Sequence, residues 1–404
     1  MDNHLLVRYG ELSLKKNNRK QFIKKVNQHI KDVLASFSNL QFESKGMRYY
    51  IILNGTNPQP IIEILKKIPG IHSFSLVSKA ESNIEAIKEL ALKVMKKENL
   101  NGTFKVETNR GDKNFPLTSL TITKEVSKYL FQNIPNLKAD MHHPDLILNI
   151  DVRYEGTFLF TKIIEGMKGF PSGILGKTML MISGGIDSIV AGYLTIKKGM
   201  DIDAVHFASP PYTSLLALQK VVDLLETLTP SVTNQKINLY IVPFTKMQEV
   251  IYKFVREDYG ITIMRRMMYR MTEILAMQNE AIVIINGESI GQVASQTLES
   301  ISVISEVVSM PIIRPLAMLD KQDIINLSQE INTFDISIRP HEDCCTVFVP
   351  KHPQIKPRLT IVKREESLFD YQSLIDEAIE KTEKITLQSN KHYQVIGTKL
   401  TDLL

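Results

Sequence analysis

The chain of 404 residues contains no tryptophan and only two cysteines. These cysteines, Cys344 and Cys345, are neighbours in the sequence, so a framework of disulfides is excluded. A bond between adjacent cysteines would close a strained ring, and we therefore expect any role of the two sulfurs to be that of thiols. Such sparing use of cysteine is typical of a reducing compartment.

The sequence also lacks a long apolar segment and a targeting signal. No apolar run approaches the roughly 20 residues with which a helix crosses a bilayer. The N-terminal residues MDNHLLVRYGEL do not have the basic and then apolar layout of a signal peptide. We therefore expect a cytoplasmic protein with no membrane partner.

Positive charge is only slightly in excess, because the sequence has 49 basic and 44 acidic residues and a net charge of +5. This balance permits a polyanionic partner without requiring one. The excess is uneven, however, since seven basic residues and only one acidic residue, Glu11, lie between Arg8 and Lys25. This segment is either a nucleic-acid contact or a solvated basic helix.

The length favours two or three domains, and the pattern of apolar residues divides the chain accordingly. Residues 1–74 predict strand, basic helix, strand and short helix, the order of a small ferredoxin-like α+β unit. Residues 75–165 predict a second α/β unit, and the glycine-rich residues 166–177 predict a linker. From 178 to 404 short apolar strands alternate with helices, which indicates a doubly wound parallel sheet.

The clearest chemical signal is SGGIDS at residues 183–188, between a predicted buried strand and a helix. Gly184 and Gly185 allow a sharp turn and a close approach of backbone amides to a ligand, and the helix N-terminus attracts negative charge. The loop has no lysine, which excludes a Walker A loop. Asp187 would repel phosphate unless Mg²⁺ lies between them, so the loop suits pyrophosphate plus metal. A helix cap with a tight turn is the alternative.

SGGIDS resembles the PP-loop of ATP pyrophosphatases, which transfer AMP to a carbonyl oxygen and release pyrophosphate. Further stretches resemble the tRNA uracil 4-sulfurtransferase (4-thiouridine synthetase, ThiI) family: RYGELSLK at 8–15, GMKGFPSG at 166–173, HFASPPYTS at 206–214, NGESIGQVASQT at 286–297 and PHEDCCTVFVPKHP at 340–353. That family joins a ferredoxin-like domain, a THUMP domain that binds tRNA and a PP-loop domain, in the order of the three segments. Some members add a rhodanese domain, and we expect the form without it.

The resemblance implies a reaction in two steps. ATP adenylates O4 of uridine 8 of tRNA, with Mg²⁺ and Asp187 organising the pyrophosphate, and a persulfide sulfur obtained from a cysteine desulfurase then displaces AMP. Cys344 matches the family's sulfur-carrying cysteine, whereas the residues alone do not distinguish it from Cys345. The resemblance also implies a homodimer and sulfur transfer to a small carrier protein of thiamine synthesis.

For the nucleotide, the resemblance and the PP-loop together select a set of contacts: Met181, Ile182, Ser183, Gly184, Gly185, Ser188, His206, Phe207, Arg265, Gly287 and Gln296. The side-chain chemistry agrees, since Phe207 can flank adenine and Arg265 offers a fork of donors to phosphate. For the arginines of MRRMMYR, a solvated basic helix face is the alternative. Lys321 is either a cation for the leaving pyrophosphate or a helix-capping residue.

For tRNA, the candidates are basic and amide side chains of the first two segments: Lys15, Lys16, Arg19, Lys105, Asn109, Arg110 and Lys113. Such residues favour recognition of RNA shape and phosphate rather than base edges.

The environment of the cysteines leaves alternatives open. Nearby cations such as His341 favour a thiolate, but Glu342 and Asp343 oppose it. A pair of buried thiols beside the apolar TVFVP is the plain structural reading, and a zinc site with His341 and His352 is poorly spaced. Two other functions remain open at this point: another adenylating PP-loop enzyme, such as a tRNA lysidine synthetase or an amide-forming ligase, and a non-catalytic tRNA-binding protein.

Overall fold

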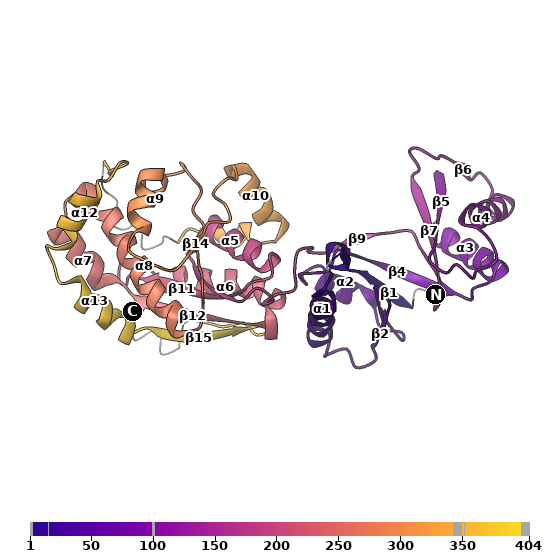
Figure 1. Ribbon diagram of the computed structural model, residues 1–404, viewed down its shortest axis with the longest axis horizontal. Coiled ribbons are helices and arrows are strands. Elements are labelled where there is room, and N and C mark those ends of the chain that lie inside the picture. The colour runs from indigo at the N-terminus through magenta and orange to yellow at the C-terminus, as the bar shows by residue number, and fades with distance from the viewer. Residues whose placement is uncertain (1–2, 15, 99–101, 342–349, 351, 397–404) are drawn as a thin grey trace. The chain divides into compact units, whose positions relative to one another are not determined.

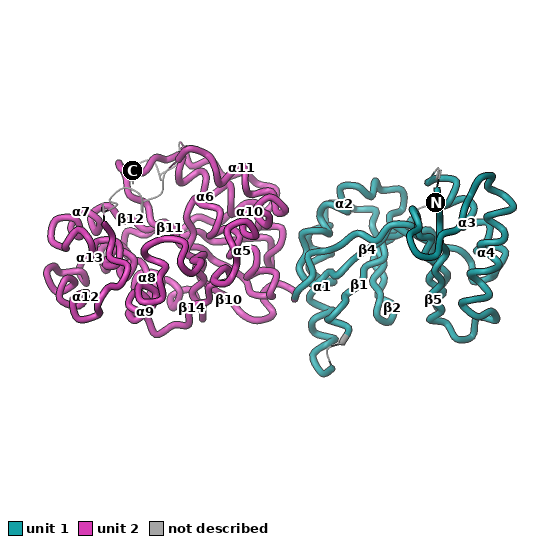
Figure 2. The backbone as a smooth tube through the Cα atoms, turned by 90° about the horizontal axis from the view of Figure 1, so that it is seen from above, with its two compact units in different colours: residues 1–169 teal, residues 170–404 magenta. Residues whose placement is uncertain are grey.

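The computed structural model describes residues 3–14, 16–98, 102–341, 350 and 352–396 (Figure 1). The chain forms two compact units, residues 1–169 and residues 170–404 (Figure 2). Among the helices in the described ranges, none combines the length and the apolar composition needed to cross a bilayer.

The first unit is built on one nine-stranded sheet in the order β2-β3-β1-β4-β8-β7-β5-β6, with β9 paired to β4. Its strands are β1 (His4–Arg8), β2 (Gln41–Lys45), β3 (Arg48–Ile52), β4 (Ser73–Ala80), β5 (Thr103–Arg110), β6 (Lys138–Ala139), β7 (Leu146–Arg153), β8 (Gly156–Phe160) and β9 (Ile164–Glu165). Its helices are the 3-10 helix η1 (Gly10–Leu14) and α1 (Arg19–Val33), α2 (Pro58–Leu65), α3 (Ile84–Glu98) and α4 (Ser119–Asn133).

Strand β4 connects the two halves of this sheet. Residues 73–77 pair antiparallel with β1, whereas residues 78–80 pair antiparallel with β8. Across the junction the rings of Tyr50 and Phe158 stack with their centroids 4.7 Å apart. The boundary that the sequence predicts at residue 74 therefore falls inside a strand that both halves share.

The second unit contains a six-stranded sheet in the order β14-β13-β10-β11-β12-β15. Its strands are β10 (Lys177–Met181), β11 (Asp201–Ala208), β12 (Lys236–Pro243), β13 (Ile284–Ile285), β14 (Ile312–Ile313) and β15 (Glu383–Gln388). Strands β10 to β14 are parallel, as predicted, but β15 runs antiparallel to β12 and closes one edge. The α/β fold class predicted from the sequence is confirmed, with this edge as the departure.

Helices pack on both faces of the second sheet (Figure 1). They are α5 (Ile186–Lys197), α6 (Leu215–Leu228), α7 (Thr245–Phe254), α8 (Gly260–Gln278), α9 (Leu298–Ser305), α10 (Lys321–Glu330), α11 (Phe334–Ser337), α12 (Leu359–Glu366) and α13 (Tyr371–Glu380), with the 3-10 helices η2 (Thr229–Ser231), η3 (Thr233–Gln235), η4 (Glu257–Tyr259) and η5 (Ala294–Gln296). On one face Val205, Phe207 and Val242 form a core with α7 and α8. The carboxyl ends of β10, β11 and β13 lie at one edge, where parallel sheets of this kind bind ligands.

The arginines of α8 pair with carboxylates, and one of them is buried. The Arg266 side chain is only 1% exposed and donates to Glu366 at 2.8 and 3.1 Å. Arg270 donates to the same carboxylate at 2.7 and 3.1 Å. The solvated basic face that was the alternative for this helix is therefore wrong for Arg266, and Glu366 joins α12 to α8.

Replacing Glu366 with glutamine is expected to destabilise the second unit in a pH-dependent way. Burial by itself raises the pKa of Glu366, but the hydrogen bonds of Arg270 and Arg266 outweigh burial and lower the pKa below 4.5. A carboxyl group whose pKa is lower in the folded state than in the unfolded state stabilises the protein at pH values above its unfolded-state pKa. This contribution is lost as the pH falls through the folded-state pKa. We expect a loss of about 2–4 kcal/mol at neutral pH, measured by urea unfolding, that shrinks below about pH 4.

Glu377 provides the matched control, because it also faces two cations but at the surface. Lys246 and Lys381 lower the pKa of Glu377 to about 2, yet these lysine side chains are 65% and 59% exposed. Water screens such pairs, so Glu377→Gln should leave the free energy of unfolding almost unchanged. Equal losses in the two variants would show that burial of Glu366 is not the cause.

Candidate active site

The glycine loop lies between the end of β10 and the start of α5. Gly185 immediately precedes the helix in an extended conformation (φ −86°, ψ 169°). Because glycine has no side-chain oxygen with which to cap the helix, the amides of the first turn are left for a ligand. Asp187 lies in that first turn, where the helix dipole stabilises a carboxylate.

Ser188 holds the turn of this loop. Its hydroxyl accepts a hydrogen bond from the Ser183 amide at 3.2 Å and donates to the Ser183 carbonyl at 3.0 Å. The Gly185 amide in turn donates to the Ser183 hydroxyl at 3.3 Å. The two serines therefore shape the loop through contacts within it.

A cavity of about 250 Å³ opens beside the loop. It is lined by Met181, Ile182, Ser183, Asp187, Ser188, His206, Phe207, Arg265, Met268, Asn286, Gly287, Glu288 and Gln296. The structure thus brings together the predicted nucleotide contacts from five segments of the chain, while Gly184 and Gly185 lie in the loop without lining the cavity. Met268, Asn286 and Glu288 were missed by sequence reasoning, although the last two flank the predicted Gly287.

Glu288, which lines the cavity, pairs with two arginines. Its carboxylate is 2% exposed and pairs with Arg265 at 2.5 Å and with Arg314 at 2.7 Å. Tyr269 donates to the same carboxylate at 3.3 Å, and burial raises the pKa of Tyr269 to about 12, so its hydroxyl keeps its proton. Two arginines against one carboxylate leave one positive charge in excess at this wall.

Two neighbouring residues of β11 also line the cavity. Nδ1 of His206 lies 3.1 Å from the Ile182 carbonyl oxygen, which ties the strand end to the glycine loop. Phe207 is buried and packs edge-to-face against Phe244, with the ring centroids 5.2 Å apart. Phe207 therefore adds an apolar surface to the lining.

Gly287 is required by a close approach of two backbones. A Cβ atom at this position would lie 2.8 Å from the carbonyl carbon of Asp187 and from N and Cα of Ser188. Contacts this short to backbone atoms do not occur without movement. The loop after β13 and the start of α5 therefore depend on the absence of a side chain here.

Lys321 reaches the glycine loop from the first residue of α10. Its Nζ lies 2.6 Å from Oδ1 of Asp187, although the two residues are 134 positions apart. Both side chains remain partly exposed. A cation and a carboxylate are thus held together at the N-terminus of α5, where phosphate would bind.

Cys344 and Cys345 lie outside the described residues, as does the zinc alternative that requires them. The described residues on either side of them make long-range hydrogen bonds. Before the cysteines, Nζ of Lys220 donates to the carbonyls of Arg339 and His341. After them, the Thr297 hydroxyl donates to the Ile355 carbonyl at 2.7 Å, directly beside the cavity residue Gln296.

Some of the RNA candidates have exposed side chains, and others form ion pairs or hydrogen bonds within the protein. Lys16, Arg19, Asn109 and Lys113 are exposed, and Lys15 lies outside the described residues. Lys105 pairs with Glu107 at 2.7 Å. Arg110 donates to the carbonyls of Phe115 and Leu117 at 3.1 and 3.2 Å, so its guanidinium supports the turn that carries Lys113.

Comparison with known proteins assigns each part of the chain. Residues 4–75 match the ThiI ferredoxin-like domain, residues 81–162 match the THUMP domain, and residues 173–371 match the family described as thiamine biosynthesis protein (ThiI). The chain is 47% identical over 390 residues to a probable tRNA sulfurtransferase of Bacillus pumilus, covering 96% of this chain and 97% of the relative. It is 42% identical over 402 residues to a probable tRNA sulfurtransferase of Oceanobacillus iheyensis, covering 100% and 99%.

Among solved structures, the chain is similar to a 4-thiouridine synthetase crystallised as an RNA complex with bound ATP. The TM-score is 0.87 with 34% identity, covering 96% of this chain and all of that chain. A second structure, PH1313 from Pyrococcus horikoshii, shares the fold with a TM-score of 0.62 and 20% identity, covering 82% of this chain and 99% of that one. On the strength of these full-length matches, the chain belongs to the ThiI family of tRNA sulfurtransferases.

Proposed function

We propose that this protein is an ATP-dependent tRNA sulfurtransferase that converts uridine 8 of tRNA to 4-thiouridine. The observation that carries the proposal is the cavity beside SGGIDS, where a helix N-terminus and Arg265 supply positive charge near the apolar Phe207, and where Lys321 pairs with the lining residue Asp187. This combination suits a nucleoside triphosphate. The RNA and ATP bound to the related 4-thiouridine synthetase support the same assignment.

The cavity fits ATP in charge and in hydrogen bonding. Oε1 of Gln296 is buried and has no hydrogen-bond partner in the part of the chain that the structure describes, so it can accept from the amino group of adenine. Phe207 supplies the apolar surface for the ring. At the other end, the amides of the α5 N-terminus and the Lys321 ammonium face the phosphates.

Mg²⁺ fits the donor set at Asp187. Mg²⁺ prefers carboxylate and phosphate oxygens as ligands. Lys321 engages Oδ1 of Asp187, and the second carboxylate oxygen remains on the same group for a metal. When bound, Mg²⁺ would neutralise charge on the pyrophosphate that leaves.

The chemistry proceeds by two displacements. O4 of the uridine attacks the α-phosphorus of ATP, and the bond to pyrophosphate breaks. The outer sulfur of a persulfide on Cys344 then attacks C4, and the C4–O bond to AMP breaks. A second thiol finally attacks the inner sulfur, which releases 4-thiouridine and leaves a disulfide for an added thiol to reduce.

The partners follow from these steps. The exposed Lys16, Arg19, Asn109 and Lys113 of the first unit are proposed contacts to tRNA phosphate and sugar. A cysteine desulfurase supplies the persulfide. We further propose that the same cysteine serves a sulfur carrier protein of thiamine synthesis, that the enzyme forms homodimers, and that it works in the cytoplasm.

The experiment that tests the function combines the protein with ATP, Mg²⁺, cysteine, a cysteine desulfurase and unmodified tRNA. We expect AMP and pyrophosphate release together with a thiolated uridine detected by nucleoside mass spectrometry. Release of AMP without a thiolated base would favour another adenylating PP-loop enzyme. Absence of AMP and of thiolation would favour a protein that only binds tRNA.

Replacing Lys321 with methionine is expected to lower kcat/KM for ATP by about 10²-fold, because a cation that stabilises the leaving pyrophosphate is lost. AMP release under saturating tRNA measures the effect. Lys246→Met is the control, since Lys246 on α7 also forms an ion pair, but its partner Glu377 is not among the residues that line the cavity, whereas Asp187 is. Equal activity of the two variants would remove Lys321 from the site.

A further inference from the structure

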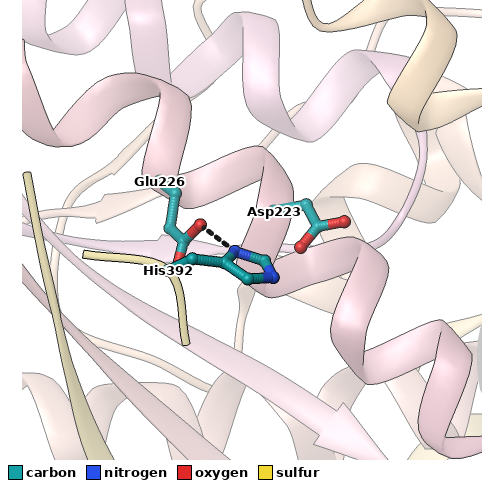
Figure 3. A group of neighbouring side chains, drawn as sticks. All are labelled: Asp223, Glu226 and His392. Carbon is teal, nitrogen blue, oxygen red and sulfur yellow. Dashed lines mark hydrogen bonds and ion pairs between the residues drawn. The ribbon is translucent and has the colours of Figure 1, made fainter. Parts of the chain in front are cut away.

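Charged side chains of the second unit gather in a group on α6 that has the spacing of a metal site. Asp223 and Glu226 project from this helix toward His392, and their ligand atoms lie within 4.8 Å of one another (Figure 3). Their carboxylates already have protein donors, since Asp223 pairs with Arg339 and Glu226 accepts from His392 at 2.9 Å and from the Tyr393 amide at 2.6 Å. These contacts fasten residues 392–393 to α6, which is a structural role.

The carboxylate of Glu288 is placed differently, because it lies at the cavity and its two oxygens bind different arginines. Oε1 accepts from Nη2 of Arg265 at 2.5 Å. Oε2 accepts from Nε of Arg314 at 2.7 Å and from the Tyr269 hydroxyl at 3.3 Å. The side chain of Glu288 is buried, so these donors rather than water set the orientation of the carboxylate.

Arg314 holds Glu288 from outside the cavity. It directly follows β14 and is not among the residues that line the cavity, whereas Arg265 and Glu288 are. Its Nη2 donates to the hydroxyl of Ser305, the last residue of α9, at 2.7 Å. Because the guanidinium is a planar fork, these contacts on different nitrogens fix its direction toward Glu288.

The second arginine also changes the charge that a nucleotide meets. Arg265 and Glu288 by themselves form a neutral pair, in which the carboxylate competes with phosphate for the guanidinium. Arg314 adds one positive charge and neutralises part of the carboxylate, so Glu288 holds Arg265 in place with a weaker pull. Charges a few ångströms apart in a poorly hydrated site interact strongly, so this difference should be measurable in the affinity for phosphate.

We propose that Arg314 is a positioning residue for ATP binding and adenylation, which acts through Glu288 to place Arg265 for the phosphates. The proposal rests on the ATP-dependent function proposed above. Arg314 acts on the nucleotide through these two residues and not by contact with it. Its loss should therefore weaken binding of the phosphates and leave binding of the adenosine part unchanged.

The affinities of the full-length protein for ATP and for adenosine test this role in Arg314→Met, with isothermal titration calorimetry as the measurement. We expect the Kd for ATP to rise about 10-fold and the Kd for adenosine to stay within about twofold of wild type. In the presence of tRNA, kcat/KM for AMP release should fall by about the same 10-fold as the affinity for ATP. A role in general support of the cavity would instead weaken adenosine and ATP alike.

A double-mutant cycle with Glu288→Gln shows whether Arg314 acts through the carboxylate. In the Glu288→Gln protein the charged link between the two arginines is missing, so the further change Arg314→Met should alter the Kd for ATP by less than about threefold. A positive charge that attracted ATP from a distance would not need Glu288. In that case Arg314→Met would cost the same 10-fold in both backgrounds, and the positioning role would be overturned.

Arg270→Met is the matched control, because Arg270 is likewise the second arginine on a buried carboxylate. Arg270 and Arg266 share Glu366 as Arg314 and Arg265 share Glu288, and the side chains of Arg270 and Arg314 are 19% and 15% exposed. Glu366 is not among the residues that line the cavity. Arg270→Met should therefore lower the melting temperature while both nucleoside affinities remain at wild-type values.

A milder variant keeps the test decisive if Arg314→Met melts below the assay temperature. Ser305→Ala removes one hydrogen bond of Arg314 and leaves its charge in place. We expect a loss of about threefold in affinity for ATP with adenosine unchanged, and an unchanged affinity for ATP would overturn the proposal. If instead wild-type protein binds ATP no more tightly than adenosine, the proposed function itself fails.

Discussion

Cys344→Ser is expected to abolish persulfide-dependent formation of 4-thiouridine, with a loss of about 10³-fold or more, while AMP release continues. A serine hydroxyl cannot carry the transferred sulfur, whereas adenylation is expected to depend on the glycine loop and on cavity residues such as Asp187 and Arg265. Mass spectrometry of tRNA nucleosides measures thiolation, and AMP release in the same reaction reports the first step. The split between the two readouts is what distinguishes a sulfur carrier from a structural thiol.

Cys345→Ser is the paired variant, since it changes the neighbouring thiol by the same single atom. We expect it to support at least one turnover of thiolation, and to slow later turnovers if Cys345 breaks the persulfide bond. Free sulfide should restore thiolation in Cys344→Ser. Full activity of Cys344→Ser with persulfide, together with loss in Cys345→Ser, would assign the relay to the neighbour.

Gly287→Ala is the second change for which we expect a large effect. A methyl group here would lie 2.8 Å from three backbone atoms at the start of α5, so the loop after β13 and the glycine loop must move apart. Overpacking of this kind costs about 1–3 kcal/mol of stability. A displacement near 1 Å of the phosphate-binding backbone should lower kcat/KM for AMP release by about 10²-fold.

Two other glycines provide graded controls for this prediction. A Cβ atom on Gly260, the first residue of α8, would meet no atom within 4 Å, so Gly260→Ala should behave as wild type. A Cβ atom on Gly185 would meet only the Ser183 hydroxyl at 3.5 Å, an ordinary contact. Gly185→Ala should therefore keep its melting temperature but bind ATP more weakly, because the methyl group obstructs the approach of phosphate.

Wild-type activity and melting temperature in Gly287→Ala would show that the two backbones separate without cost. In that case the close approach would not position the glycine loop, and the role of Gly287 would have to be sought in direct contact with the nucleotide.

Local patterns in the sequence were sufficient to predict the elements and the motif. The continuous apolar run at β10, the glycines of SGGIDS and the periodicity of α5 are short-range features, because they depend on backbone conformation and on which residues are buried. Parallel strands bring their carboxyl ends to one edge, so HFASPPYTS and NGESIGQ could be placed beside SGGIDS before any contact was known.

The antiparallel direction of β15 could not be predicted in this way. This edge strand pairs with β12 across 148 positions, between Asn238 and Thr386, and its six residues carry no turn signal that relates them to β12. Its direction depends on how α12 and α13 return the chain to the sheet, which periodicity does not encode.

The sequence by itself determined the fold class, the family resemblance and most of the residues that line the cavity beside SGGIDS, because these follow from local periodicity and contiguous motifs. Only the tertiary structure decided which charges meet: Lys321 with Asp187, Glu288 with Arg265 and Arg314, and Lys220 with the carbonyls before Cys344. The physical reason is that a charged side chain far away in the sequence reveals nothing of its partner until packing places the two within a few ångströms, where their Coulomb attraction becomes strong.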